Sequence, residues 1–305
     1  MGAGATEGTA TDDSLDDAAS VFAGLRPQLF GIAYQMLGSA AEAEDVVQET
    51  WLRWQGADRA DVRDPAAFLV TVATRLAINV VRSARKRREQ YVGPWLPEPV
   101  DTAKGPEAGA EQAADVELAV LLLLERLSPP ERAAYVLRES FDYPFAEIAA
   151  ILQVTEANAR QLASRARRRL AAERRNPVSR TEHRRLLETF IAAARTGDLD
   201  ALEELLAEDA VSYSDGGGAV RGAARIPVAG RERVARFVVA FAPRFWPGAT
   251  VALVEANGHP AALLTRDGTP FALLAIGASD AGVNRLLWVL NPAKLRGFAA
   301  RGADG

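Results

Sequence analysis

The stretch that decides the fold is Tyr143-Pro-Phe-Ala-Glu-Ile-Ala-Ala-Ile-Leu-Gln-Val-Thr-Glu-Ala-Asn-Ala-Arg-Gln-Leu-Ala-Ser-Arg-Ala-Arg-Arg-Arg-Leu170. Pro144 suits the first turn of a helix, and the apolar residues after it repeat at helical spacing as far as Leu152. Thr155 can cap a second helix by accepting a backbone N–H of its first turn, while Glu156 complements the positive end of the helix dipole. The stretch therefore predicts a helix-turn-helix.

The second of these helices is predicted to have one buried and one basic face. Its apolar stripe consists of Ala159, Leu162, Ala166 and Leu170, which follow at steps of three and four. Guanidinium groups on the other face could bind phosphates or the O6 and N7 edge of guanine. An ordinary amphipathic surface helix is the alternative. Our candidates for contact with duplex DNA are Arg160, Gln161, Ser164, Arg165 and Arg168.

Composition limits the classes of protein that remain. The chain has 305 residues, of which 49% are hydrophobic, so we expect two or three domains with cores of their own. A formal net charge of −4 excludes a uniformly basic coat for nucleic acid, yet residues 82–88 and 160–175 are locally basic. Such patches, rather than the total charge, attract phosphates.

Several kinds of site are disfavoured by the residue types. There is no cysteine, which excludes disulfides and cysteine-bound zinc, and two histidines make a multi-histidine metal site a weak hypothesis. The longest aliphatic run, Ala119–Leu124, is far shorter than a membrane span, and the N-terminus lacks the order of a signal peptide. We expect a cytoplasmic protein with no cofactor, no metal and no membrane partner.

Three helices are predicted in the N-terminal part of the chain. Residues 1–19 are rich in Gly, Ala, Thr and acids and predict a disordered arm. The helices follow at residues 21–37, 41–54 and 66–88. The outer face of the second carries Asp45, Gln48, Glu49 and Arg53, and that of the third carries Arg75, Asn79, Arg82, Arg85 and Lys86. An acidic face is often merely solvated, whereas five basic residues within 82–88 exceed what the helix dipole alone favours.

Residues 90–115 predict a linker, because their prolines remove backbone donors and favour an extended chain. A flexible linker does not need Trp95 and Leu96, so we expect this segment to dock on another part of the protein. Residues 116–127 then predict an apolar helix, and Ser128-Pro-Pro-Glu131 begins another. With the helix-turn-helix these form a helical domain over residues 116–175.

Taken in succession, residues 21–172 resemble the body of a bacterial extracytoplasmic-function (ECF) sigma factor. The text that carries the resemblance is Ala43-Glu-Asp-Val-Val-Gln-Glu-Thr-Trp-Leu-Arg-Trp54, Phe68-Leu-Val-Thr-Val-Ala-Thr-Arg-Leu-Ala-Ile-Asn79 leading into Arg82-Ser-Ala-Arg85, and Leu127-Ser-Pro-Pro-Glu-Arg132. Three further stretches resemble the subgroup with a fused C-terminal SnoaL-like domain. They are Tyr91-Val-Gly-Pro-Trp-Leu-Pro-Glu-Pro99, Asp215-Gly-Gly-Gly218 and Asn291-Pro-Ala-Lys-Leu295.

The resemblance implies a multidomain fold with two all-α sigma domains, region 2 over residues 20–89 and region 4 over residues 116–175. It implies promoter DNA and core RNA polymerase as partners. The polymerase contacts would be the clamp helices of the largest subunit, bound by Asp45, Gln48, Glu49 and Arg53, and the flap. The minus 10 element would be held by the 56–64 loop and by Arg75, Asn79, Arg82, Arg85 and Lys86. Siblings often carry Asn and Asp where this chain has Arg75 and Asn79.

Residues 180–300 predict an α+β domain. Helices are expected at 181–195, 198–207 and 230–241 and a strand at 210–213, followed by an antiparallel meander whose turns include Asn257-Gly258 and Asp267-Gly268. This order fits the cone of the SnoaL and nuclear-transport-factor-like (NTF2-like) superfamily. Asp215 lies in a glycine turn and His259 beside another turn, so we find no catalytic set and expect no enzyme. Where the subgroup's glycine motif commonly ends in Lys, this chain has Ala219.

We expect this domain to control the sigma body in cis, with the linker near two of its loops. The residues assigned to this role are Trp95, Leu96, Asp215, Gly216, Gly217, Gly218, Asn291, Pro292, Lys294 and Leu295. A small ligand of unknown identity in the C-terminal domain is a further hypothesis. Two other functional classes stay open from the residues alone: a helix-turn-helix regulator with a ligand-binding domain, and an isomerase or cyclase on a cone fold.

Overall fold

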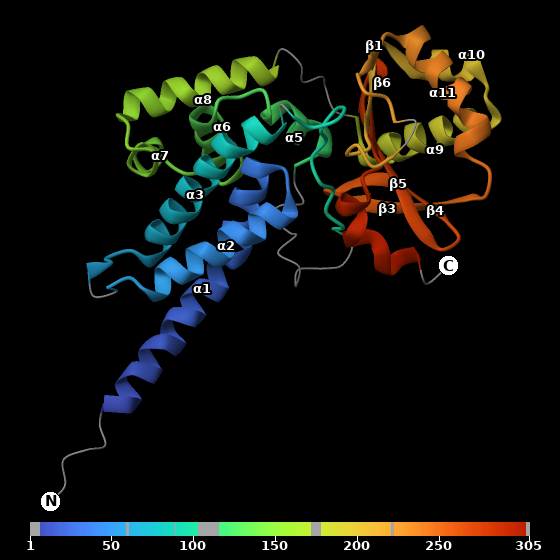
Figure 1. Ribbon diagram of the computed structural model, residues 1–305. Helices are drawn as coiled ribbons and strands as arrows, with labels where there is room; N and C mark the ends of the chain where they lie inside the picture. Colours follow the sequence, from blue (N-terminus) through green and yellow to red (C-terminus); the bar gives the residue numbers. More distant parts are fainter. Residues whose placement is uncertain are drawn as a thin grey trace, which may run out of the picture. The chain divides into compact units, whose positions relative to one another are not determined.

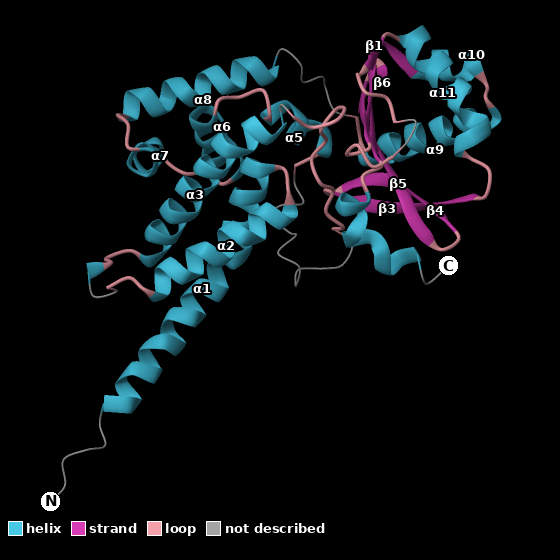
Figure 2. Cartoon of the chain, in the orientation of Figure 1, coloured by secondary structure: helices cyan, strands magenta, loops and turns pink. Residues whose placement is uncertain are grey.

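The protein divides into two compact units, one helical and one that combines helices with a sheet. The computed structural model describes residues 7–58, 61–88, 90–102, 116–171, 178–220 and 223–302. The helical unit comprises Met1–Ser83, Pro106–Ala113 and Leu127–Arg167, and the mixed unit comprises Ala84–Gly105, Ala114–Arg126 and Arg168–Gly305. Figure 1 labels the elements, and Figure 2 separates helices from strands by colour.

The second and third helices follow their predicted bounds closely, whereas the first begins earlier than predicted. Ser39 caps the second helix, because its Oγ accepts a hydrogen bond from the backbone N–H of Glu42 at 3.3 Å. The helices of this part of the chain are α1 (Glu7–Leu37), α2 (Ala40–Gln55), α3 (Pro65–Arg88), α6 (Pro129–Tyr135), the π-helical η3 (Val136–Ser140), α7 (Phe145–Leu152) and α8 (Glu156–Ala171).

The start of α1 corrects the prediction of a disordered arm for residues 7–19, while residues 1–6 lie outside the described part of the chain. The helix begins at Glu7 rather than near Val21. Its packed part holds it against α2, since Ala18 is buried and its carbonyl accepts a hydrogen bond from Trp54 Nε1 at 3.1 Å. Once such a nucleus exists, each added residue gains one backbone hydrogen bond, so a helix extends into sequence that would not form one alone.

The α3 helix contributes to the core of the helical unit, although its composition resembles that of a membrane-spanning helix. Pro65–Ala84 is long and apolar enough to cross a membrane, with a mean hydropathy of 1.3. Leu69, Val70 and Ala73 have no exposed surface, however, because the fold itself covers them. In the most apolar window of this stretch 39% is buried inside the protein, so burial accounts for part of its hydropathy.

A buried arginine joins the end of α1 to α6. Arg132 is only 2% exposed, and its Nη1 donates to the carbonyl of Met36 at 2.6 Å. Burial lowers the pKa of Arg132 to about 10, which still leaves the guanidinium charged at neutral pH. A buried charge persists only where hydrogen bonds offset its lost hydration. From the sequence, Arg132 was noted only as the last residue of the Leu127–Arg132 stretch that resembles sigma factors.

The helix-turn-helix forms with one adjustment. Pro144 is the residue before α7 and not part of its first turn. Thr155 caps α8 as predicted, because its hydroxyl accepts from the backbone N–H of Asn158 at 3.2 Å. Between the two helices Gln153 has φ 56°, a left-handed conformation that reverses the chain.

The mixed unit contains a six-stranded sheet in the order β2-β1-β6-β5-β4-β3. The antiparallel meander of β3 to β6 is confirmed, whereas the parallel pairing of β1 with β6 was not predicted. The elements are α5 (Leu118–Leu124), α9 (Arg180–Thr196), α10 (Leu199–Leu205), β1 (Leu206–Asp215), β2 (Val228–Ala229), α11 (Arg231–Phe245), β3 (Ala249–Ala256), β4 (His259–Arg266), β5 (Thr269–Ser279), β6 (Gly282–Val289) and the 3₁₀ segment η4 (Pro292–Gly302).

The predicted hairpin turns at Asn257-Gly258 and Asp267-Gly268 are both present. Asn257 and Gly258 both have positive φ, at 54° and 72°, as do Asp267 and Gly268, at 50° and 72°. Positive φ at both central residues matches the right-handed twist of the flanking strands. These turns set the register of β3, β4 and β5.

The core of the mixed unit lies between α9, α11 and one face of the sheet. Phe190 of α9 packs against Trp288 of β6 with ring centroids 6.2 Å apart, and Val234 and Val238 of α11 are buried in the same cluster. The α5 helix, predicted as part of the domain over residues 116–175, also contacts β5 of the sheet.

Gly282 should be intolerant of a side chain. Its φ is 103°, and an added Cβ would lie 2.5 Å from the carbonyl oxygen of Leu205. We expect Gly282→Ala to lower the free energy of unfolding by about 2 kcal/mol or more, because both backbone strain and a backbone clash oppose it. Urea unfolding followed by circular dichroism measures this. Gly297→Ala is the control, since a Cβ there meets nothing within 4 Å; equal midpoint shifts for both variants would contradict the explanation.

Candidate functional site

The exposed face of α8 carries the predicted DNA-contact residues. Arg160, Gln161, Ser164, Arg165 and Arg168 are all exposed, while Ala159, Leu162, Ala166 and Leu170 are buried beneath them. The helix is therefore rotated as its apolar spacing predicted.

Neighbouring side chains orient part of this basic face. The guanidinium of Arg160 lies over the ring of Phe145, 4.7 Å from its centroid, and pairs with Glu156. Arg167 pairs with Glu139 at 2.6 Å, and that hydrogen bond raises the pKa of Arg167. The ion pair joins α8 to η3, whereas the side chain of Arg168 makes no hydrogen bond or ion pair to the described residues.

The second predicted surface is the outer face of α2. Asp45, Gln48, Glu49 and Arg53 are exposed, and Arg53 pairs with Glu49 at 3.0 Å. Leu52, which sequence reasoning passed over, is 60% exposed between them. Beside this face, α1 and α2 form an open pocket of about 230 Å³ lined by Ala19, Phe22, Arg26, Glu44, Val47, Gln48 and Trp51.

The third surface, on α3, is only partly as predicted. Asn79 and Arg82 are exposed, whereas the side chains of Arg85 and Lys86 lie outside the described residues. Arg75 donates from Nε to the carbonyl of Ile151 at 2.9 Å and from Nη2 to that of Ala150 at 3.2 Å. These are carbonyls at the end of α7, which lack partners within their own helix. In this arrangement Arg75 caps the end of α7, and its minus 10 contact stays a prediction.

The linker docks on the mixed unit through a buried carboxylate. Asp215, at the end of β1, has no exposed surface. Its Oδ1 accepts from the Tyr91 hydroxyl at 2.5 Å and the Gly217 N–H at 3.1 Å. Its Oδ2 accepts from the Leu96 N–H at 2.9 Å and the Lys294 ammonium at 2.7 Å. Three segments far apart in the chain therefore meet at one side chain.

Lys294 completes this arrangement from η4. Its ammonium, besides binding Asp215, donates to the Leu96 carbonyl and lies 4.3 Å from the centroid of the Trp95 ring. The cation is thus neutralised by Asp215 and covered by an aromatic face. Leu96 is fully buried, as the docking prediction requires.

Tyr91 is the contact that sequence reasoning missed. Burial and its hydrogen bond to Asp215 raise the pKa of Tyr91 well above its ordinary value, so its phenol stays protonated and donates. Its oxygen in turn accepts from Asn291 Nδ2 at 2.9 Å. The sequence did offer one indication of this contact, because Tyr91 is the first residue of the Tyr91–Pro99 linker stretch that resembles the subgroup.

The other residues predicted to lie where the linker docks contribute by their burial or by their small size. Leu295 is buried, while Pro292 is exposed at the start of η4. A Cβ on Gly217 would lie 2.4 Å from Asn291 Nδ2, and one on Gly216 would lie 2.8 Å from the Cβ of Ala223. The glycine turn is required because the linker and η4 approach it this closely.

A second contact extends the docking. Val100 and Asn257 exchange hydrogen bonds, from Val100 N to Asn257 Oδ1 at 3.1 Å and from Asn257 N to the Val100 carbonyl at 3.0 Å. Thr102 N donates to the Glu255 carbonyl at 3.2 Å, and Asp101 forms an isolated bridge with Ala256. Linker residues 100–102 therefore pair with the β3–β4 turn.

The two histidines lie together in the mixed unit, with ring centroids 5.6 Å apart. His183 is buried, with Nε2 3.1 Å from the carbonyl of Ile276, and burial lowers the pKa of both rings. Within the described part of the chain no cluster of three or more metal-binding side chains occurs. These observations indicate that the two imidazole rings are neutral and have a structural role.

Comparison with known proteins agrees with the helical part of this description. Residues 21–87 match the Sigma-70 region 2 family, and residues 117–170 match the family described as Sigma-70, region 4. The chain is 40% identical over 292 residues to the ECF RNA polymerase sigma factor SigJ of Mycobacterium tuberculosis, covering 91% of this chain and 93% of SigJ. It is 31% identical to the probable ECF sigma factor SigI of the same organism, covering 88% and 92%.

The likeness extends to the fold. The crystal structure of M. tuberculosis SigJ superposes with a TM-score of 0.73 at 36% identity and covers 92% of this chain and 98% of that one. Because the match spans the mixed unit as well as the helices, the C-terminal α+β domain is part of the likeness. The chain therefore belongs to the family of extracytoplasmic-function RNA polymerase sigma factors.

Proposed function

We propose that this sigma factor binds core RNA polymerase through α2, holds the minus 10 element with α3 and the loop before it, and reads the minus 35 element with α8. The polymerase contacts are the clamp helices of the largest subunit and the flap. The observation that carries the proposal is the exposed basic face of α8, on the second helix of a helix-turn-helix. The exposed acidic face of α2 supplies a separate protein contact.

Run-off transcription with purified core polymerase tests the proposal. We expect the chain to direct core polymerase to at least one promoter mapped from transcript starts. Tight duplex binding by the chain alone, without polymerase association, would instead favour a helix-turn-helix regulator. We further propose that the chain acts in the cytoplasm and that its C-terminal domain acts by contact rather than by catalysis.

Arg165→Ala should weaken minus 35 recognition and leave polymerase binding intact. A guanidinium that contacts a base edge contributes about 1–3 kcal/mol, so we expect the affinity of the holoenzyme for its promoter to fall roughly 5- to 150-fold. Electrophoretic mobility shift with wild-type and minus 35-scrambled duplexes measures this, and the variant should lose the difference between them.

Two variants make this test specific. Arg184→Ala, an exposed arginine on α9, removes the same charge from another element and should leave promoter affinity unchanged. Asp45→Ala combined with Glu49→Ala should reduce binding to core polymerase instead. If Arg165→Ala and Arg184→Ala weaken promoter binding equally, the effect is general charge and not recognition.

The DNA-reading elements must separate before they can act together. Arg75 of α3 is bonded to the end of α7, and Gln28 Nε2 of α1 donates to the Tyr143 hydroxyl at 3.0 Å. Two promoter elements two helical turns apart are separated by roughly 70 Å. Elements joined by side-chain hydrogen bonds cannot reach both, so we propose that this is a closed form of the sigma body.

Arg75→Ala should therefore open the helical unit. Removing the cap of α7 breaks two hydrogen bonds to a charged donor, each contributing about 1.5–3 kcal/mol. We expect promoter binding by the holoenzyme to rise several-fold, and small-angle scattering of the free chain to show a larger radius of gyration. Were Arg75 a base contact, as the sequence suggested, the same variant would weaken promoter binding, so the sign of the change decides between the two roles.

Cis regulation by the C-terminal domain is proposed from the docked linker. The linker joins regions 2 and 4, and its residues 91–102 are bonded to the mixed unit through Asp215 and the β3–β4 turn. A linker held in this way cannot extend. Docking is therefore proposed to control how far the two promoter-binding regions can separate.

Asp215→Asn should release the linker. It leaves the Lys294 ammonium buried without its carboxylate, and breaking a buried ion pair costs about 3–5 kcal/mol. We expect new proteolytic cleavage between Tyr91 and Thr102 and altered run-off transcription. Adding Lys294→Met, which removes the unpaired cation, should restore part of the stability but not the docking.

Asp280→Asn is the matched control, because Asp280 is exposed in the β5–β6 turn. A linker as well protected in Asp215→Asn as in the wild type would refute the docking role. Released linker with unchanged transcription would refute only the regulatory role.

A further inference from the structure

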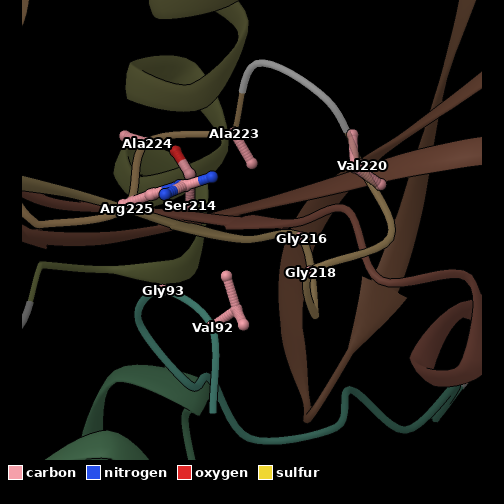
Figure 3. A pocket seen from close by; sticks show the side chains of 9 residues that line it. All are labelled: Val92, Gly93, Ser214, Gly216, Gly218, Val220, Ala223, Ala224 and Arg225. Atoms are coloured by element: carbon pink, nitrogen blue, oxygen red, sulfur yellow. The ribbon is translucent and has the colours of Figure 1, made fainter.

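A cavity of about 230 Å³ lies beside the glycine turn of the mixed unit, separate from the Asp215 contacts. Figure 3 shows Val92 approaching it from the linker and Ala223 from the opposite loop. Its lining residues are Val92, Gly93, Ser214, Gly216, Gly218, Val220, Ala223, Ala224 and Arg225. The cavity is smaller than the roughly 300–1,000 Å³ of sites for drug-sized ligands, so it suits a molecule of a few heavy atoms.

The walls of the cavity belong to two segments that meet only when the linker is docked. A Cβ on Gly93 would lie 3.7 Å from the Ala224 carbonyl oxygen, and one on Gly218 would lie 3.2 Å from the Cβ of Val92. The linker and the loops are thus in close contact around the opening. Undocking the linker would remove one wall and with it the cavity.

One side of the cavity is suited to an anion. Arg225 makes no hydrogen bond or ion pair with the described residues. Ser214 is 5% exposed, and its hydroxyl likewise has no hydrogen-bond partner among them. A guanidinium and a hydroxyl together match the two oxygens of a carboxylate.

The other sides are apolar. Val220 and Ala223 are partly buried, and Val92 leaves 51% of its surface exposed, which is unusual for a valine in a docked segment. A ligand that covered Val92 would remove this apolar surface from water. The combination of an anion-binding side and small apolar walls describes a ligand with a carboxylate at one end and a short branched hydrocarbon at the other.

We propose that this cavity binds a small monocarboxylate, with its carboxylate on Arg225 and Ser214 and its hydrocarbon between Val92, Val220 and Ala223. Because the site exists only with the linker docked, binding stabilises the docked form. A metabolite of this class would thus act as an effector of the sigma factor. The regulatory consequence rests on the proposed cis regulation, whereas the binding site does not.

Isothermal titration of the full-length chain with isobutyrate tests the site. We expect saturable binding with a dissociation constant in the millimolar range, as befits so small a ligand. Arg225→Gln should weaken it about tenfold, the loss of one charge-assisted contact. Ala223→Val, which narrows the cavity without changing charge, should weaken it as well, so the test does not depend on one variant.

Three controls test whether binding occurs at this site and depends on the carboxylate. Arg233→Gln, an exposed arginine on α11 away from the cavity, should bind isobutyrate as the wild type does. Isobutyramide, which has the same shape without the charge, should not bind. Inorganic phosphate that binds at Arg225 while isobutyrate does not would overturn the carboxylate assignment. Absence of isobutyrate binding, or equal binding by Arg225→Gln, would overturn the site.

A separate experiment measures whether isobutyrate binding and docking of the linker depend on each other. Asp215→Asn should lose isobutyrate affinity, and isobutyrate should protect linker residues 91–102 of the wild type from proteolysis. If isobutyrate binds and protects the linker but transcription does not respond, the site stands and the proposed cis regulation fails. If Asp215→Asn binds isobutyrate as the wild type does, the cavity does not depend on docking and that part of the proposal is overturned.

Discussion

The ion pair between Asp215 and Lys294 is the interaction on which the arrangement of the linker depends. A carboxylate without exposed surface is costly unless hydrogen bonds and an opposite charge replace its hydration. Here the replacements come from the linker, the glycine turn and η4. Residues from all three segments donate to the one carboxylate, so its hydration is replaced most fully when the linker is docked.

This dependence explains the residue types of the surrounding loops. Gly217 has no room for a side chain because Asn291 and Tyr91 occupy that space. Ala219 is exposed on the turn and lies outside the set of donors around the Asp215 carboxylate. The ammonium group that pairs with Asp215 belongs to Lys294.

The helical unit obeys a similar constraint with arginines. Arg132 is buried and bonded to the end of α1, and Arg75 is bonded to the end of α7. In both cases a guanidinium satisfies backbone carbonyls that a helix terminus leaves without partners. Such contacts are few and specific in geometry, and each joins two separate elements of the helical unit.

Local pattern was sufficient for much of the fold and for the orientation of its helices. The helix-turn-helix, the capping by Ser39 and Thr155, the outward face of α8 and the two hairpin turns follow from spacing, side-chain chemistry and the conformations that Asn-Gly and Asp-Gly favour. All of these depend on residues within a few positions of one another.

Contacts between distant segments were decided only by the tertiary structure. The parallel pairing of β1 with β6, the packing of α5 on β5 and the capping of α7 by Arg75 join residues that no periodicity relates. The sequence alone determined the outward face of α8 and the stretches of residues that resemble sigma factors. Only the fold decided which charges meet, because burial and partner geometry, rather than residue type, determine whether an arginine contacts DNA or caps a helix.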